Sequence, residues 1–298
     1  MTRSKRVVVT GASGFLGRSL VTYLAREGYD VLALSRSSEA FDQANVVSGA
    51  MPDLANPGAV WSGLLQRDDA VVHLAGLAHG SLDDERHDLI NHQGTMLLAE
   101  AAAAASVERL IFVSSIAAQT GPAASHILTE ADEPKPANAY GRAKLAAERV
   151  VASSGSRYTI LRPGVIYGED AKGNLRLLEQ LARLPVPLPL AGVSAQRSLL
   201  SVANFNSAVG LVLLNAAAIN KIFLVADPAP LSVADMITAL RQKMGRRPGL
   251  FYVPPALLKA ALTTLGLKRI WTRIGEPFVI STDCLQAIGW RPERAEPH

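Results

Sequence analysis

Apolar and polar positions alternate along the first half of the chain in blocks that predict strands and helices in turn. The short β-branched run 7–9 is followed by the amphipathic stretch 18–27, which ends at Gly28, and then by a second apolar run at 29–34. Short continuous apolar runs are typical of strands buried on both faces of a parallel sheet. Their alternation with helices predicts an α/β fold with a doubly wound, parallel Rossmann sheet.

The second half of the chain has a different pattern. Pro185, Pro187 and Pro189 fall in one short segment and predict an extended loop or an edge strand. Ser232 has the position of an N-cap for the helix that follows it. The remaining predicted elements are strands at 44–48, 70–74, 110–114, 158–161 and 222–225, and helices at 59–66, 89–105, 140–153, 204–217, 233–244 and 256–267.

Three glycines follow the first predicted strand directly. Gly11, Gly14 and Gly17 have the spacing G-x-x-G-x-x-G, one residue longer in the turn than the G-x-G-x-x-G dinucleotide fingerprint. Glycines at a strand-to-helix turn let the backbone approach a pyrophosphate, and the helix N-terminus offers free N–H groups. We therefore predict a dinucleotide site here, although a bare strand–turn–helix corner gives the same pattern.

Composition and charge narrow the class of protein. The 298 residues are 49% hydrophobic, and the net charge is +4 with a pI of about 9.3. The arginines are spread along the chain without a basic run, so we expect an anionic small substrate and no nucleic acid. The single cysteine, Cys284, excludes an internal disulfide. With no signal peptide and no apolar segment of spanning length, we expect a soluble cytoplasmic protein without membrane insertion.

A tyrosine and a lysine stand four residues apart in the helix predicted at 140–153. Tyr140 and Lys144 then share one helix face, and an ammonium beside a phenol is expected to lower the pKa of that phenol. The same spacing also occurs in surface pairs without function. Ser114 and Ser115, at the carboxyl end of a predicted strand, favour a site because ligands bind at that edge.

Together these motifs resemble the extended short-chain dehydrogenases/reductases of the NAD-dependent epimerase/dehydratase family, in the nucleotide-sugar 4-ketoreductase/4-epimerase branch. The resemblance covers nearly the whole chain. It implies a nucleotide-binding domain at 1–165 that also receives 198–226, and a smaller C-terminal lobe, mainly 166–298, for substrate. The matching positions are Gly11, Gly14, Gly17, the run 73–76, Asn91, Gly94, Thr95, Ser114, Ser115, Tyr140, Lys144 and the run 161–168.

The resemblance also implies residue roles. Tyr140 is the expected general acid/base, Lys144 the residue that binds the nicotinamide ribose, and Ser115 the residue that bonds the reacting oxygen. Small residues follow the strand at 70–74, where the chain passes the cofactor. The expected cofactor-binding residues are Gly11, Ser13, Gly14, Phe15, Leu16, Gly17, Ser35, Arg36, Asp53, Leu54, Leu74, Ala75, Gly76, Asn91, Ser114, Tyr140, Lys144, Pro163 and Val165.

The end of the second strand bears on the choice of cofactor. NAD-binding folds usually place an Asp or Glu there to hold the ribose 2′-hydroxyl, but this chain has Ser35 and Arg36. A hydroxyl and a guanidinium suit a 2′-phosphate. We therefore favour NADP(H), with NAD(H) as the alternative.

The substrate residues are predicted from the resemblance and from position. They are His79, Ser115, Asn174 and Arg197, with Arg273 as a further candidate for a phosphate, whereas buried His73 is expected to be structural. The pattern after Arg197 resembles 4-ketoreductases that act on UDP-4-keto-6-deoxy-N-acetylhexosamines for surface polysaccharide such as lipopolysaccharide.

Other functions and the assembly stay open. The alternatives are a UDP-sugar 4-epimerase with tightly bound NAD, a reductase of a non-nucleotide ketone, and a non-catalytic NADP(H) sensor. No histidine or cysteine cluster has metal-ligand spacing, so no metal is expected. The family resemblance also implies a homodimer that is formed through the helices at 89–105 and 140–153.

Overall fold

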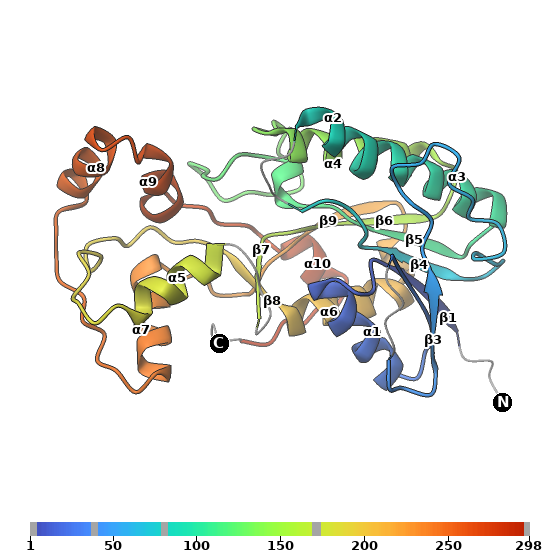
Figure 1. Cartoon of the computed structure of the whole chain (residues 1–298), viewed down its shortest axis with the longest axis horizontal. Helices are drawn as coiled ribbons and strands as arrows, with labels where there is room; N and C mark the ends of the chain where they lie inside the picture. Colours follow the sequence, from blue (N-terminus) through green and yellow to red (C-terminus); the bar gives the residue numbers. More distant parts are fainter. Residues whose placement is uncertain (1–4, 37–40, 79–82, 169–173, 295–298) are drawn as a thin grey trace.

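A sheet of seven parallel strands forms the larger part of the protein. The computed structural model describes residues 5–36, 41–78, 83–168 and 174–294. The strand order, β3-β2-β1-β4-β5-β6-β9, reverses direction between β1 and β4 (Figure 1). In open α/β sheets ligands bind outside the carboxyl ends of the strands at this reversal. The strands are β1 (Arg6–Thr10), β2 (Asp30–Ser35), β3 (Val46–Ala50), β4 (Ala70–His73), β5 (Arg109–Val113), β6 (Tyr158–Pro163) and β9 (Lys221–Val225).

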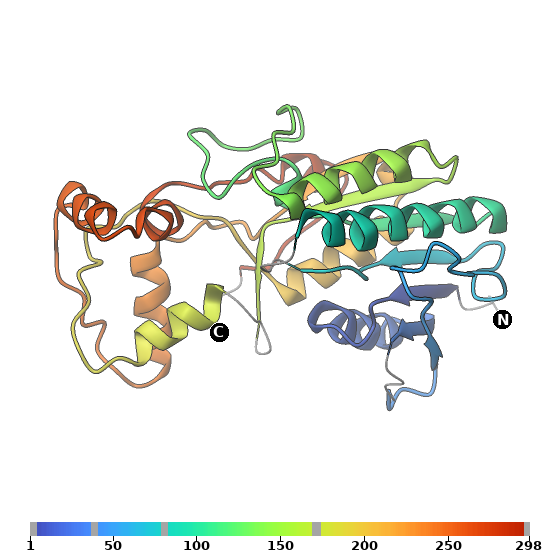
Figure 2. The ribbon, with the colours of Figure 1, turned by 45° about the horizontal axis from the view of Figure 1, so that its top comes forward.

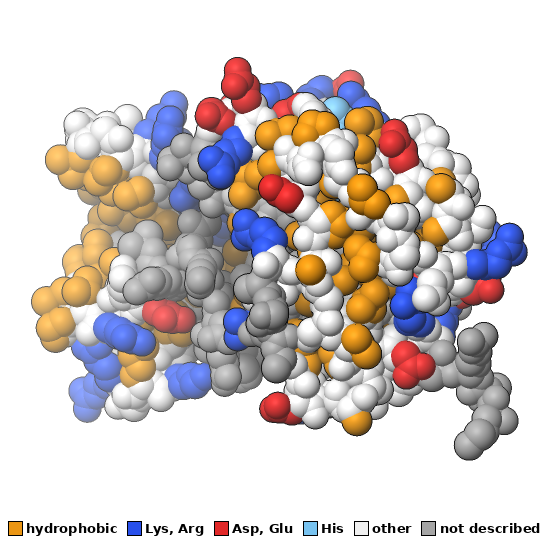
Figure 3. Space-filling view, turned by 45° about the vertical axis from the view of Figure 1, so that its right-hand side comes forward, with side chains coloured by type: hydrophobic (Ala, Val, Ile, Leu, Met, Phe, Trp, Pro, Cys, Tyr) orange, Lys and Arg blue, Asp and Glu red, His pale blue; other side chains and the backbone are white. Residues whose placement is uncertain are grey.

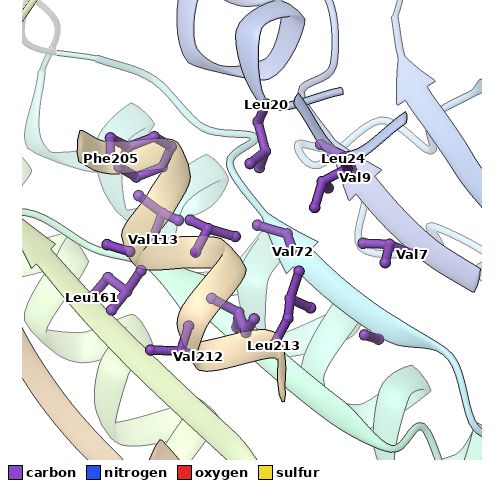
Figure 4. Packing of buried hydrophobic residues seen from close by; sticks show 14 of the residues in the cluster. Val7, Val9, Leu20, Leu24, Val72, Val113, Leu161, Phe205, Val212 and Leu213 are labelled. Atoms are coloured by element: carbon purple, nitrogen blue, oxygen red, sulfur yellow. The ribbon is translucent and has the colours of Figure 1, made fainter. Parts of the chain in front are cut away.

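Alternate residues of the strands enter two different cores, one on each face of the sheet. Val7 and Val9 of β1 pack with Leu20 and Phe205 on one face, whereas Val8 packs on the other (Figure 4). A strand buried on both faces is apolar at every position, which explains the unbroken valine run. The first face is covered by α1 (Phe15–Arg26), α6 (Val202–Leu214) and α10 (Asp283–Ala287), and the second by α2 (Asp84–His87), η1 (Asp88–Gln93), α3 (Gly94–Ala105) and α4 (Ala139–Ser153).

The C-terminal lobe lies at one end of the molecule, beyond the carboxyl ends of the strands (Figures 1 and 2). Its own core joins α5 to α7. Ser232 is the N-cap of α7, as the sequence predicts, and the structure adds a reciprocal capping box with Asp235. A two-stranded parallel sheet, β7 with β8, connects the lobe to the main sheet. The elements of this region are β7 (Val165–Tyr167), α5 (Asn174–Arg183), β8 (Leu199–Ser201), α7 (Val233–Lys243), α8 (Pro255–Thr264) and α9 (Lys268–Gly275).

The end of the chain returns to the nucleotide-binding half of the molecule. After the lobe, α10 packs beside β9, and the Trp290 side chain is buried in the same core as β1 and α6. The Trp290 indole nitrogen donates to the Ser207 hydroxyl at 3.0 Å, and the Asn204 amide nitrogen donates to the carbonyl of Glu293 at 2.8 Å. The last described residues therefore hold α6 in place.

Two sequence predictions differ from the structure. The helix predicted at 59–66 is wrong: the segment forms turns, because Gly63 has a φ of 80° and Trp61 and Leu65 turn into the core separately. The helix predicted at 89–105 begins earlier and contains the π-helical segment η1, which hydrophobic periodicity does not reveal. No prediction was made for the ten-residue helix α5, for the shorter elements β7, β8, α9 and α10, or for the 3₁₀ segments η2 (Ile116–Ala118) and η3 (Ala216–Ala218).

Candidate active site

Two glycines of the first turn are required by contacts that exclude a side chain. Gly11 has a φ of 73°, and a Cβ atom there would lie 2.8 Å from the backbone nitrogen of Ala75. A Cβ atom on Gly17 would overlap the carbonyl oxygen of Gly11. The glycines therefore let β1, α1 and the segment that follows β4 meet at one point.

Helix α1 begins at this turn, so its N-terminal N–H groups lie beside the glycines. Gly14 is the N-cap of this 12-residue helix, and no side chain among the described residues caps it. Uncapped N–H groups and the positive end of the helix dipole bind phosphate. Ser13 precedes the helix, the ring of Phe15 lies against Gly168, and Leu16 packs against the core. This cradle fits the pyrophosphate of a dinucleotide.

The residues beyond β2 and β3 flank this turn. Ser35 is buried at the end of β2, whereas Arg36 is exposed. Leu54 is buried against α3: a Cβ atom added to Gly94 would lie 2.7 Å from the Cβ atom of Leu54. Asp53 is exposed and accepts a hydrogen bond from the Ala55 amide at 3.0 Å. Of the two residues predicted to meet a 2′-phosphate, Arg36 is therefore the exposed one.

Small residues after β4 allow the chain to pass close to Lys144. Leu74 and Ala75 lead to Gly76, where a Cβ atom would lie 2.5 Å from the Asn91 Oδ1 atom and 3.8 Å from the Lys144 Nζ atom. Leu77, which follows Gly76, is held by the Asn91 side chain: the Asn91 Oδ1 accepts the Leu77 N–H at 2.7 Å, and the Asn91 Nδ2 donates to the Leu77 carbonyl at 3.1 Å. The loop is thus fixed beside the lysine.

The structure brings Ser115, Tyr140 and Lys144 together at the carboxyl end of β5. The Asn138 side chain caps α4 by accepting the Gly141 N–H at 2.8 Å. Gly141 packs so closely on the Ala117 carbonyl of η2 that any side chain would overlap it. This contact places Tyr140 in hydrogen bonding with the Ser115 hydroxyl. One turn further along α4, the Lys144 Nζ donates to the Val113 carbonyl at 3.0 Å.

Burial dominates the titration of both α4 residues. It raises the pKa of Tyr140 to about 12, against a smaller lowering by the Ser115 hydrogen bond. The prediction that Lys144 lowers the pKa of Tyr140 is therefore wrong for this structure. Burial lowers the pKa of Lys144 to about 8, and the negative charge of Glu148 opposes that change. At neutral pH the phenol is protonated and the amine is charged.

A buried ion pair lies behind Lys144. The Arg162 Nη2 donates to the Glu148 Oε2 at 2.6 Å, and the Arg162 Nη1 donates to the Gln119 Oε1 at 2.8 Å. The Ser114 hydroxyl donates to the other oxygen of Glu148, so this hydroxyl, predicted to contact the cofactor, bonds within the protein. Sequence analysis assigned no role to Glu148, although its spacing of four from Lys144 places it on the same helix face.

Pro163 and Val165 lie beside the catalytic candidates, one strand further along the sheet. Pro163 ends β6 and pairs with Val225, and Val165 begins β7 opposite Leu199. Because β5 and β6 are adjacent and parallel, the carboxyl end of β6 lies next to the segment that carries Ser115. Both residues thus occupy positions that suit the nicotinamide side of a cofactor.

The predicted substrate residues are less well defined. His79 lies outside the described residues, and Asn174 is described only as the first residue of α5. Arg197 donates from Nη2 to the Pro122 carbonyl at 2.8 Å and from Nη1 to the Glu276 carbonyl at 2.7 Å. Burial and the nearby charge of Arg273 lower its pKa to about 10. Arg197 therefore joins the two parts of the molecule, with a second guanidinium close by.

His87 is a site residue that sequence analysis missed. It is buried at the end of α2, and its ring lies edge-on to that of Tyr140 with 5.8 Å between centroids. The Asn91 Nδ2 lies 3.2 Å from its Nδ1 atom. The π-helical segment η1 begins at the next residue, and π-helical turns are frequent at functional sites. The spacing of four between His87 and Asn91 was the available signal.

His73 has the structural role that the sequence predicts. Its ring is buried between the hydroxyls of Thr10, 2.7 Å from Nδ1, and Thr95, 3.1 Å from Nε2. Burial and the charge of Lys144 lower the pKa of His73 to about 3, so the ring is neutral. Among the described residues no cluster of His, Cys, Asp and Glu could hold a metal ion. The described helices include none that is long and apolar enough to cross a membrane.

Comparison with known proteins decides the family. Residues 7–226 match the NAD dependent epimerase/dehydratase family. The chain belongs to this family. It is 28% identical to a UDP-glucose 4-epimerase from Vibrio cholerae, over 97% of this chain and 91% of that protein. It is 30% identical to a dTDP-4-dehydrorhamnose reductase from Mycobacterium tuberculosis, over 60% of this chain and 57% of the reductase.

Solved structures agree on the fold. MoeE5, solved in complex with UDP-glucuronic acid and NAD, superposes with a TM-score of 0.76 at 24% identity, over 98% of this chain and 96% of MoeE5. The seven-stranded sheet thus has the fold of the extended short-chain dehydrogenase/reductase epimerases. Family membership makes the protein an NAD(P)-dependent enzyme. The relatives include both sugar epimerases and sugar reductases.

Proposed function

We propose that the protein uses NADPH to reduce the C4 ketone of a nucleotide sugar. The observation that carries this proposal is the hydrogen-bonded pair Ser115 and Tyr140 beside Lys144. When bound, NADPH supplies the hydride that the carbonyl carbon accepts. Tyr140 donates its phenolic proton to the carbonyl oxygen, and Ser115 holds that oxygen by a hydrogen bond. A Tyr140 pKa of about 12 keeps the phenol in the protonated form that reduction needs.

The end of β2 supports NADPH over NADH. The chain has Ser35 and Arg36 at the place where an acidic residue holds a 2′-hydroxyl in NAD-binding folds, and Arg36 is exposed. A guanidinium forms paired hydrogen bonds with a phosphate. In this proposal the cofactor's pyrophosphate binds the α1 N-terminus, and Lys144, next to Gly76, binds the nicotinamide ribose.

Two neighbouring arginines support a nucleotide sugar as substrate. The positive charge of Arg273 affects Arg197 directly, and both lie where the lobe meets the nucleotide-binding half. Two guanidiniums at one place favour an anionic ligand such as a diphosphate. Arg197 uses only part of its five N–H donors on backbone carbonyls, so donors remain for a phosphate.

A UDP-sugar 4-epimerase with retained NAD is the second candidate. The observation that favours it is the similarity to the Vibrio cholerae UDP-glucose 4-epimerase along 97% of the chain. Epimerisation at C4 uses the same acid and base on the same oxygen, first to oxidise and then to reduce. The two candidates differ in whether the oxidised cofactor is released after each turnover.

The reduction is tested by following NADPH oxidation with a UDP-4-keto-6-deoxy-N-acetylhexosamine. We expect Tyr140→Phe to lower kcat by about 10² to 10⁴ without weakening NADPH binding. Tyr158→Phe is the matched control, because Tyr158 begins β6 at the opposite edge of the sheet. Wild-type turnover by Tyr140→Phe would refute the proposed role of this residue.

Cofactor identity separates the two candidates. Nucleotide released from the denatured protein should be NADP(H) or absent for the reductase, and stoichiometric NAD⁺ for the epimerase. We expect Arg36→Ala to raise the KM for NADPH about tenfold and to leave the KM for NADH unchanged, because a charge-assisted phosphate contact is lost. Equal effects on both KM values would contradict the NADPH assignment.

A further inference from the structure

The α8–α9 hairpin exposes several apolar side chains, while Leu258 and Ile274 pack against the lobe core. The sequence of α8 is rich in alanine and leucine, yet none of its ten residues is buried. Leu257 is 62% exposed and Leu265, just after the helix, is 71% exposed; the aromatic Phe251 and Tyr252 are exposed directly before it. Helices of folded domains normally bury such a face, and exposed apolar patches mark interaction sites.

Positive charge is concentrated in the same segment. The hairpin, residues 255–275, contains Lys259, Lys268, Arg269 and Arg273 and no aspartate or glutamate. Glu276 follows it directly, and its carboxylate lies 3.9 Å from the Lys259 Nζ. The hairpin thus carries four basic and no acidic residues within a chain whose net charge is +4. Lys259, Lys268 and Arg269 of the hairpin are exposed. Figure 3 shows hydrophobic and basic side chains close together at the lobe end of the molecule.

We propose that the α8–α9 hairpin docks on the surface of an anionic lipid bilayer. An exposed apolar helix with aromatic residues and flanking lysines and arginines is the composition of segments that lie in a membrane interface. Their apolar side chains enter the boundary of the acyl chains, while their cations meet anionic headgroups. The hairpin lies on the surface in this arrangement and does not span the bilayer.

Charge argues against a second copy of this chain as the partner. A symmetric contact through the hairpin would bring the four basic residues of each copy face to face, and one neighbouring Glu276 per copy offsets only part of that charge. Like charges across an interface are unfavourable. An anionic surface removes this repulsion. In Figures 1 and 2 the hairpin lies at the end of the molecule away from the N-terminal strands, so docking leaves the α1 turn accessible.

The test is co-sedimentation of the full chain with vesicles of phosphatidylglycerol and phosphatidylcholine, compared with vesicles of phosphatidylcholine alone. We expect binding to the anionic vesicles that weakens with added salt, and background binding to the neutral ones. The variant Leu257→Glu/Leu265→Glu should lower the partition coefficient by about tenfold or more, because two apolar side chains are lost from the interface. Leu214→Glu is the matched control, since Leu214 of α6 is also 71% exposed.

Several outcomes would overturn the proposal. One is background binding of the protein to anionic vesicles, and another is an equal loss of binding in Leu214→Glu. A third is that the protein binds an acidic polypeptide but no vesicles. A dimer that light scattering shows to dissociate in Leu257→Glu/Leu265→Glu would assign the hairpin to self-association instead. Both variants should retain turnover in solution, so the result is independent of the proposed reductase activity.

Discussion

Replacing Glu148 with glutamine tests the buried charges behind the active site. Arg162 donates to both Glu148 oxygens, from Nε at 3.0 and 3.2 Å and from Nη2 at 2.6 Å. Both side chains are 3% exposed. Glu148→Gln keeps the shape but removes the negative charge, so it leaves the Arg162 guanidinium buried with the neutral Gln119 and one amide oxygen.

The expected loss of stability is large for a single isosteric change. Removing one partner of a buried ion pair costs about 3–5 kcal/mol, because the other charge remains desolvated. At about 2 °C per kcal/mol for a chain of this size, the Tm should fall by roughly 6–10 °C. Glu100→Gln, an exposed glutamate on the neighbouring α3, should leave the Tm nearly unchanged.

The same variant should change the pH dependence of turnover. Glu148 raises the pKa of Lys144, which burial brings down to about 8. Lys144 carries its charge below that pKa, so turnover that needs the ammonium falls as the pH rises through about 8. Without Glu148 the pKa is lower, and the decline in kcat/KM should begin at a lower pH.

Calorimetry and pH–rate profiles measure the two effects. The double variant Glu148→Gln/Arg162→Met removes both charges and should recover most of the lost Tm, as a double-mutant cycle would show. A Tm within about 1 °C of the wild type, together with an unmoved alkaline limb, would refute both the ion-pair argument and its link to Lys144.

Three other variants test separate contacts of the site. Gly17→Ala places a methyl group on the Gly11 carbonyl and should raise the Kd for NADPH at least about tenfold. Gly58→Ala, in an exposed loop, should leave this Kd unchanged. An unchanged Kd in Gly17→Ala would contradict the packing argument. His87→Phe keeps a ring beside Tyr140 but loses the Asn91 hydrogen bond, so the KM for NADPH should rise about fivefold, whereas an unchanged KM would exclude a positioning role. Arg197→Lys loses the paired contacts with the Pro122 and Glu276 carbonyls. The Tm should therefore fall by a few degrees, and the KM for the nucleotide sugar should rise about tenfold. A change in Tm alone would show that Arg197 is a purely structural residue.

Much of the sheet and the placement of Tyr140 and Lys144 on one helix face were predictable from the sequence because they rest on local patterns. Valines that enter two cores require an unbroken apolar run, and the spacing of Tyr140 and Lys144 follows from helix geometry. The pKa of Tyr140 was not predictable, because it depends on how deeply the tertiary structure buries the phenol and not on the nearby charge alone.

Features that depend on contacts distant in the sequence were missed. His87 and Tyr140 contact each other although they are 53 positions apart in the sequence. The π-helical segment that follows His87 has no periodic signature. The hydrogen bond from the Ser114 hydroxyl to Glu148 is another such contact, which a strand pattern does not indicate. The turn around Gly63 forms where a helix was predicted, because the left-handed backbone of this glycine interrupts helical geometry.

The return of the chain end to the nucleotide-binding half has a consequence for synthesis. Leu285 and Trp290 complete the same core that Val7 and Val9 begin, and Glu293 fixes α6 through Asn204. During translation the first strands leave the ribosome long before these residues exist. The core on this face of the sheet therefore cannot close until residues 285–293 have been made, and its first half keeps an open hydrophobic face until then.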